Sequence, residues 1–292
     1  MKHQIRNQSL VVEISALGAE LSSIRKVGED LEYLWQLNPK IWERQAPLLF
    51  PIVGRLKDEE YTYGGRTYRI QIHGFAREKV FQVVQHSDDR VEFILLHDSD
   101  TLACYPFKFR LRIIYSLHGN EIRKTHVVEN LGDGPMYYEI GGHEGYNLAL
   151  FEGERMEDYF IEFHGMKELH TYTTDADIMV NRKKKNVPFD EASRLYLSYE
   201  VFRDDALIID GFSRHMVCLR NTKNNRSVTV KFDDFQYLGL WTKYMRSNYI
   251  CIEPWSSLPD CNYLGKELSE KEGVRKLEAF GKETLAYSII IE

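Results

Sequence analysis

The feature that most limits the possible folds is a regular alternation of apolar and polar residues along residues 107–117. Lys108, Arg110 and Arg112 stand between the apolar positions at its start. Those apolar positions are Phe107, Phe109, Leu111, Ile113, Tyr115 and Leu117. Successive side chains of a strand point to opposite faces, so a period of two predicts a half-buried β-strand. His118, Gly119 and Asn120 then supply a turn before residues 122–128, which predicts an antiparallel hairpin.

A second hairpin is expected at residues 61–72. Its two central residues, Gly64 and Gly65, suit a two-residue turn with positive φ angles, and apolar residues alternate on either side. His73 comes at the end of the second strand, on the same parity as Arg69 and Gln71. We therefore expect the His73 imidazole on the polar face of that strand.

Further strands are expected at residues 80–84, paired with 91–96, and at 228–232 and 286–291. Helical periodicity is weak and is confined to the short segments 39–44 and 191–197. Many short strands separated by turn residues predict an all-β fold, a large antiparallel β-sandwich with few short helices. We expect residues 1–292 to form a single domain.

Composition and charge exclude several classes of protein. The net charge of −6 argues against nucleic-acid binding, and the basic run 182–185 is expected to be a solvated loop without a partner. No stretch approaches the roughly 20 apolar residues of a membrane span and no signal peptide is recognisable, so we expect a cytoplasmic protein. The four cysteines show no CxxC spacing, which predicts reduced, mostly buried thiols.

Three short motifs carry the residues of an acid/base site. His143 lies in GGHEGYN (residues 141–147), His73 opens HGFAR (73–77), and Glu253 lies in CIEPW (251–255). Two imidazoles and one carboxylate can together accept one proton and donate another at neutral pH. Each motif alone is weak, since a single histidine or glutamate is often structural.

Metal chemistry is not the expected use of these residues. His143 and Glu144 begin like the HExxH signature of zinc proteases, but Asn147 stands where the second histidine is needed, and the preceding glycines disfavour a helix. We assign no metal ligand, although His73, His143 and a carboxylate could still hold a divalent ion.

Aromatic residues near the motifs suit a sugar, whose apolar C–H faces pack on aromatic rings. The candidates are Trp35, Trp42, Tyr146, Trp241 and Trp255. For any single one of them, packing in the core is the ordinary explanation.

Together these motifs resemble the aldose 1-epimerase (galactose mutarotase) family, specifically its shorter LacX-type bacterial branch. The resemblance covers nearly the whole chain. It rests on EYLW, APLLFPIVGRLKD and HGFAR within residues 32–77, on GGHEGYN, and on DDAL (204–207), YLGLW (237–241) and IEPW (252–255).

The resemblance implies a β-supersandwich that interconverts the α and β anomers of a free aldose without a cofactor. It implies Glu253 as the general base at the anomeric hydroxyl and His143 as the general acid at the ring oxygen, with His73 assisting. Arg55 and Asp205 would bind substrate hydroxyls, with Asp204 as the neighbouring alternative to Asp205. Tyr146 and Trp241 are further candidates for substrate binding. We expect a small-molecule sugar as the partner and a monomer or homodimer.

One departure from the family pattern bears on the site. The family usually has Pro, Ala and Phe after the motif histidine, where this chain has Glu144, Gly145 and Tyr146. A carboxylate and a phenol beside His143 are expected to raise its pKa or to change which sugar hydroxyls are accepted, and Glu253 is expected to raise that pKa as well.

Three other functions remain open. A sugar 6-phosphate mutarotase would need arginines to converge on a phosphate, for which Arg44, Arg55 and Arg77 are candidates. A non-catalytic sugar-binding or sensing protein would keep the pocket alone. A glycosidase would use Glu253 and Asp205 on either side of a glycosidic bond.

Overall fold

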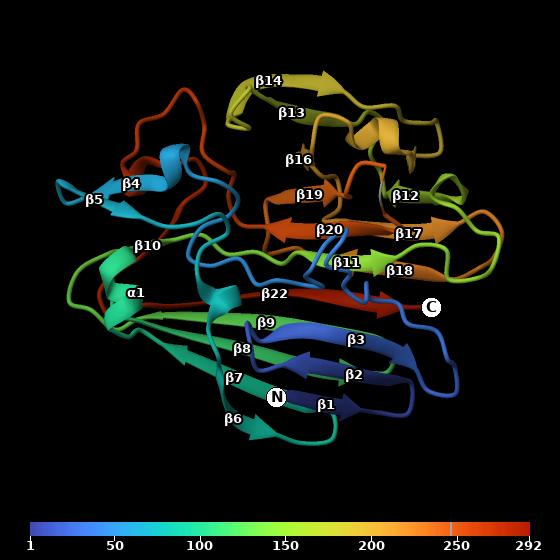
Figure 1. The fold of residues 1–292 in the computed structure, drawn as a ribbon, viewed down its shortest axis with the longest axis horizontal. Coiled ribbons are helices and arrows are strands. Elements are labelled where there is room, and N and C mark those ends of the chain that lie inside the picture. Colours follow the sequence, from blue (N-terminus) through green and yellow to red (C-terminus); the bar gives the residue numbers. More distant parts are fainter. Residues whose placement is uncertain (246) are drawn as a thin grey trace.

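Two antiparallel sheets dominate a computed structural model, which describes residues 1–245 and 247–292. The larger sheet has nine strands. In spatial order they are β15 (Arg194–Tyr196), β12 (Tyr159–Phe163), β17 (Met216–Asn221), β18 (Ser227–Lys231), β22 (Lys282–Ile291), β9 (Glu121–Asn130), β8 (Phe109–His118), β7 (Arg90–Leu96) and β6 (Gln82–His86). In Figure 1 this sheet begins with β6 to β9 at the bottom of the view and continues through β22 to β18, β17 and β12 at the right.

The second sheet has four strands and holds most of the residues singled out by the motifs. Its order is β11 (Glu144–Asn147), β20 (Tyr249–Trp255), β19 (Tyr237–Trp241) and β16 (Leu207–Ile209). Glu144 of β11 contacts Lys124 of β9 and Tyr287 of β22, so this sheet packs on the middle of the nine-stranded sheet. Apolar side chains form one large core, whose members are spread along the chain, the first being Ile5 and the last Ile291.

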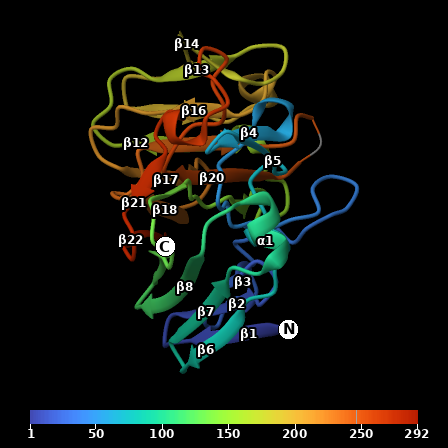
Figure 2. The same cartoon turned by 90° about the vertical axis from the view of Figure 1, so that its left-hand side faces the viewer.

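Smaller sheets cover the edges of this sandwich. The three-stranded sheet β1–β3 lies against β7 and β8 in both views (Figures 1 and 2). Its strands are β1 (Lys2–Arg6), β2 (Leu10–Ser15) and β3 (Glu20–Lys26). The two-stranded sheets are β4 (Glu60–Tyr63) with β5 (Arg66–Arg69), β10 (Met136–Tyr138) with β21 (Arg275–Leu277), and β13 (His170–Thr174) with β14 (Val180–Asn186).

Helices are short and few among the described residues. The α-helix α1 (Ser99–Cys104) is capped by Asp98, which accepts a hydrogen bond from the Thr101 N–H. The 3-10 helices are η1 (Lys57–Glu59), η2 (Ala76–Glu78), η3 (Met156–Asp158), η4 (Tyr199–Phe202) and η5 (Leu268–Glu270). None of the helices in the described chain is long and apolar enough to cross a membrane.

The predicted all-β antiparallel sandwich is confirmed, as are its main hairpins. Strands β8 and β9 pair across Gly119 and Asn120, and β6 pairs with β7. Strands β4 and β5 pair across Gly64 and Gly65, whose φ angles of 58° and 74° are those the turn requires. The strands expected at residues 228–232 and 286–291 are β18 and the end of β22.

Three local predictions were wrong. Residues 39–44 form a turn closed by a bridge between Asn38 and Trp42, and residues 191–197 form a turn followed by β15. The basic run 182–185 lies within β14 and is not a loop, although its side chains are largely exposed. Short polar segments carry little periodic signal, so pairing with a neighbouring strand decided their conformation.

Candidate active site

The outer face of the four-stranded sheet positions the candidate catalytic residues. Gly145 of β11 pairs with Cys251 of β20, and Gly239 of β19 pairs with Glu253 of β20. His143 directly precedes β11 and is level with Glu253 in this register. Because side chains alternate along a strand, His143, Cys251 and Glu253 share the face that points away from the nine-stranded sheet.

Two glycines on this face let tryptophan rings lie close to the sheet. A Cβ on Gly145 would come within 2.8 Å of Cζ3 of Trp42, and a Cβ on Gly239 would come within 2.5 Å of Cζ2 of Trp255. At each of these positions the indole therefore lies so close to the backbone that any residue with a Cβ would displace it.

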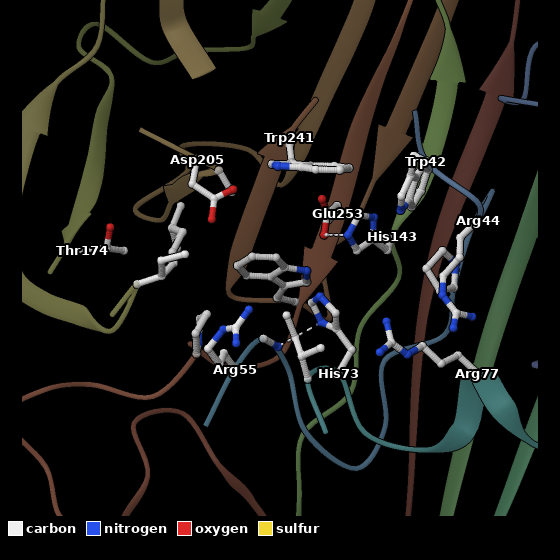
Figure 3. A pocket seen from close by; sticks show the side chains of 18 residues that line it. Trp42, Arg44, Arg55, His73, Arg77, His143, Thr174, Asp205, Trp241 and Glu253 are labelled. Atoms are coloured by element: carbon white, nitrogen blue, oxygen red, sulfur yellow. Dashed lines mark hydrogen bonds and ion pairs between the residues drawn. The ribbon is translucent and has the colours of Figure 1, made fainter. Parts of the chain in front are cut away.

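These side chains line a cavity of about 320 Å³, drawn in Figure 3. The motif residues on its wall are Trp42, Arg44, Arg55, His73, Arg77, His143, Asp205, Trp241, Glu253 and Trp255. The volume lies in the range of small-ligand pockets, and indole faces alternate with charged groups around it. A monosaccharide, with apolar C–H faces and polar hydroxyls, matches such a lining.

His143 and Glu253 are paired in this wall. Nε2 of His143 lies 3.3 Å from Oε2 of Glu253, and the Trp42 ring stacks on the imidazole at a centroid distance of 5.2 Å. Glu253 is only 1% exposed, and the polar neighbours of its carboxyl are the His143 imidazole and the Trp255 indole. A buried carboxyl with so few partners is costly, so this one is poised for a ligand.

Burial controls the proton affinities of this pair. It lowers the pKa of His143 to about 3, and the positive charges of Arg77 and Arg44 act in the same direction. It raises the pKa of Glu253 well above its usual range, and the negative charge of Glu144 adds to that effect. Both shifts favour the uncharged forms of the two groups, a neutral imidazole and a protonated carboxyl.

His73 reaches the cavity from a turn. It follows β5 with a φ of 63°, and its Nδ1 accepts a hydrogen bond of 3.1 Å from the Gly54 N–H. Burial and the nearby positive charges hold the pKa of His73 well below its usual range, so the ring is neutral. Since Nδ1 is an acceptor, the ring proton is on Nε2, where His73 can donate to a ligand.

Charged side chains flank the acid/base pair on two sides. Asp205, with a φ of 98°, lies across from Arg44 and Arg77 in Figure 3, and Arg55 lies beside His73. Burial raises the pKa of Asp205, against the opposing effects of the Ala206 N–H, Trp241 and Arg55. Its neighbour Asp204 is exposed, 2.6 Å from Lys185, and does not line the cavity.

Comparison with known proteins decides the family. Residues 1–269 match the family model described as aldose 1-epimerase. The chain belongs to the aldose 1-epimerase family. The resemblance inferred from the motifs is thereby confirmed.

Individual relatives agree with this assignment. Protein LacX, plasmid, of Lactococcus lactis subsp. lactis is 34% identical over 298 residues, an alignment covering all of this chain and 99% of LacX. The galactose mutarotase related enzyme from Lactobacillus acidophilus is 36% identical with a TM-score of 0.95, covering 100% of this chain and 97% of that one. A galactose mutarotase-like protein from Lactobacillus casei is 26% identical with a TM-score of 0.94 and full coverage of both chains.

Most residues carried over from the aldose 1-epimerase motifs meet in one place. The cavity collects Glu253, His143, His73, Arg55, Asp205 and Trp241 from segments far apart in the sequence. The expectation for Tyr146 was wrong. Tyr146 is fully buried on the opposite face of β11 and does not line the cavity, because it is three residues beyond His143 and on the other parity.

Two further expectations about His143 and His73 were also wrong. Glu144 points to the core, where it accepts hydrogen bonds from Lys124 and Tyr287, and the pKa of His143 is lowered by burial, not raised by its carboxylate neighbours. His73 lies beyond β5, which ends at Arg69, so the parity of that strand does not orient its ring. The turn and the Gly54 N–H orient it instead.

The arrangement that could hold a metal differs from the expected one. Ligand atoms of His143, Cys251 and Glu253 lie within 4.8 Å of one another. The third possible ligand is therefore Cys251, whereas His73 was expected from the sequence. All three are buried, and they are ligand types that zinc accepts. An ion there would occupy the His143 and Glu253 atoms that face the cavity.

Thr174 and Ile178 line the cavity without having been singled out in the sequence. Thr174 ends β13, and Ile178 lies between β13 and β14 with a φ of 64°. No motif marks this hairpin, which comes to the cavity from about 30 residues beyond His143. Thr and Asp are common in surface turns, so the sequence of this segment does not point to a site.

Proposed function

We propose that this chain is an aldose 1-epimerase that opens and recloses the ring of a free aldose. The observation that carries the proposal is the buried His143–Glu253 pair, whose Nε2 and Oε2 atoms lie 3.3 Å apart in the wall of an indole-lined cavity. Opening a hemiacetal requires removal of the proton on O1 and delivery of a proton to the ring oxygen. A pair with one proton supplies both functions.

In the proposed mechanism Glu253 acts at O1 and His143 at the ring oxygen. A sugar hydroxyl donating to Glu253 stabilises its carboxylate, so the proton crosses to His143 when the sugar binds. Glu253 then takes the O1 proton while His143 protonates the ring oxygen, and C1 becomes an aldehyde. After rotation about C1–C2, Glu253 gives its proton to the aldehyde oxygen, His143 takes back the proton of the hydroxyl formed from the ring oxygen, and the ring closes on the other face of C1.

The surrounding residues have separate roles in this proposal. His73 donates its Nε2 proton to the ring oxygen or a neighbouring hydroxyl, while Arg55 and Asp205 bind further hydroxyls. Trp241 offers its indole face to the C–H groups of the sugar. No cofactor takes part in any of these steps.

Polarimetry tests this function directly. Freshly dissolved α-glucose and α-galactose are followed with and without protein, together with their 6-phosphates. We expect the approach to the equilibrium rotation to accelerate in proportion to protein concentration for at least one of them. A protein that binds these sugars without any acceleration would be a sugar sensor and would contradict the proposal.

The activity of the pair should depend on pH in a specific way. In the active form the pair carries one proton. On the acid side this form is lost only when the pair takes up a second proton, on His143, whose pKa is about 3. Because the pKa of Glu253 is raised, the alkaline loss is displaced upward. We expect kcat/KM to vary less than about twofold between pH 5 and pH 7. A midpoint near pH 6.5, the value of an unperturbed histidine, would contradict this assignment.

A phosphorylated aldose is a second candidate substrate, favoured by Arg44 and Arg77 at one side of the cavity. Nε of Arg77 has no hydrogen-bond partner in the described chain. Glu78 pairs with Arg44 and lies 3.7 Å from Nε of Arg77, and the charge of Glu20 also acts on Arg77. Both guanidinium groups line the cavity, and guanidinium N–H groups are suited to binding a phosphate.

If the natural substrate is a sugar 6-phosphate, the substitution Arg77→Ala should raise its KM by about 10- to 100-fold, since a hydrogen bond between charged groups is worth about 1.5 to 3 kcal/mol. The KM of the corresponding free sugar should change by less than about threefold. Steady-state kinetics on both substrates measure this ratio. Equal changes for both would remove phosphate as the ligand of Arg77.

A further inference from the structure

The loop at residues 53–57 carries Arg55 into the cavity, and hydrogen bonds hold its backbone along its whole length. The Val53 N–H donates to Oε2 of Glu139 at 2.8 Å, and the Lys57 N–H donates to Oδ2 of Asp260 at 2.8 Å. The Arg55 carbonyl accepts from the Asp260 N–H at 3.0 Å. The two ends of the loop are thus held by two different carboxylates.

The middle of the same loop is tied to His73. The Gly54 N–H donates to Nδ1 of His73, and the Gly54 carbonyl accepts from the His73 N–H at 2.8 Å. Gly54 has a φ of 69°, and a Cβ there would come within 2.5 Å of the Pro259 ring. A shift of this loop therefore moves Arg55 and changes the hydrogen bond that selects the His73 tautomer.

Lys271 joins the two carboxylates. Its Nζ bonds Oδ1 of Asp260 and lies 3.5 Å from Oε1 of Glu139. The side chains of Lys271, Glu139 and Asp260 are 4%, 0% and 9% exposed, and none of the three lines the cavity. Burial favours a neutral lysine, but Glu139 and Asp260 outweigh it and raise the pKa of Lys271, so this residue is a cation.

Without this cation, two carboxylates would face each other in a site that excludes water. Burial already raises the pKa of Glu139 and the charge of Asp260 adds to that effect, while Lys271 opposes both. Without Lys271, one of the two carboxylates would take up a proton or turn away. Each carboxylate uses its other oxygen to hold the loop, at Val53 or at Lys57. Loss of the lysine charge is therefore transmitted to both ends of the segment that carries Arg55.

We propose that Lys271 is a positioning residue of the sugar site, which acts through Glu139 and Asp260 to fix Arg55 and the Nε2–H tautomer of His73. This inference rests on the proposed function for its kinetic consequences. It assigns no contact between Lys271 and the sugar. A displacement of about 1 Å in a binding group can lower a rate by about 10²-fold, which is the effect that Lys271 prevents.

A double-mutant cycle tests the inference with Lys271→Met and Arg55→Ala. We expect Lys271→Met to lower kcat/KM by about 10- to 100-fold in the wild-type background and at least fivefold less in the Arg55→Ala background. The same factor in both backgrounds would mean that Lys271 does not act through Arg55, and would overturn the proposal.

Glu139→Gln/Lys271→Met keeps the test open if the single variant does not fold. It retains an amide oxygen for the Val53 N–H and leaves one buried carboxylate instead of two. Arg112→Met is the matched control, because Arg112 pairs with the buried Glu92 in the nine-stranded sheet and does not line the cavity. We expect its effect on kcat/KM to stay below twofold in both backgrounds.

A readout that needs no activity separates this inference from the proposed function. Nitrogen chemical shifts of the His73 ring, assigned by comparison with His73→Asn, report its tautomer in the free protein. We expect a single Nε2–H tautomer in the wild type, a mixture in Lys271→Met, and a single Nε2–H tautomer again in Glu139→Gln/Lys271→Met, where the two carboxylates no longer repel each other. An unchanged tautomer in Lys271→Met, or a mixture in the double variant, would overturn the positioning role even if the wild type proves to be an active epimerase.

Discussion

Replacing Glu253 by glutamine should lower the enzymatic rate of anomer exchange by about 10²- to 10⁴-fold, the range that a positioned acid or base contributes. Glutamine keeps the shape of a side chain that is 1% exposed, but it neither accepts nor releases a proton at neutral pH. Polarimetry gives the rate, and titration calorimetry gives the sugar affinity. We expect that affinity to change by less than about fivefold.

Glu168→Gln is a matched control, since Glu168 is 82% exposed and lies outside the cavity. Its exchange rate should equal that of the wild type. A Glu253→Gln protein that retains more than one third of the wild-type rate would show that another group removes the O1 proton. Asp205 would then be the carboxylate to examine, because it is the other one on the cavity wall.

Replacing Lys124 by methionine should lower the free energy of unfolding by about 3 to 5 kcal/mol, since it leaves a buried carboxylate without its cation. Nζ of Lys124 donates to Oε1 of Glu144 at 2.8 Å, and both side chains are fully buried between β9 and β11. Urea unfolding followed by tryptophan fluorescence measures the change. The result bears on the site because Glu144 directly follows His143.

The double substitution Lys124→Met/Glu144→Gln should recover most of that loss, because no unpaired charge remains. Lys2→Met is a contrasting control. Lys2 and its partner Glu13 lie at the surface, where an ion pair contributes less than about 1 kcal/mol to the free energy of unfolding. A single Lys124→Met variant no less stable than the double variant would mean that Glu144 becomes protonated without appreciable cost.

The fold was largely predictable from alternation along the strands. The hairpins β8–β9 and β4–β5 follow from a period of two and from turn residues close in sequence. The short helices predicted at residues 39–44 and 191–197 were wrong because the few apolar residues of these segments fit a helix as well as a turn. Tertiary pairing, such as that of β15 with β12, settled what the local pattern left open.

The residues that line the candidate site were easier to predict than its electrostatics. Motifs identified His143, Glu253 and the arginines, but the fall in the pKa of His143 follows from burial, which a sequence does not give. Tyr146 was wrongly placed because the strand that orients it begins only at Glu144. Lys271 carries no motif, and its role is visible only through Glu139 and Asp260, more than 100 residues apart.

Exchange NMR on the wild-type protein at anomeric equilibrium tests the central claim that the His143–Glu253 pair opens the ring of a free aldose. We predict exchange cross-peaks between the α and β anomeric signals of a reducing sugar or its 6-phosphate that appear only with protein. The methyl glycosides of the same sugars should show neither exchange nor hydrolysis. Hydrolysis of a methyl glycoside, or binding of every tested sugar without exchange, would contradict the account.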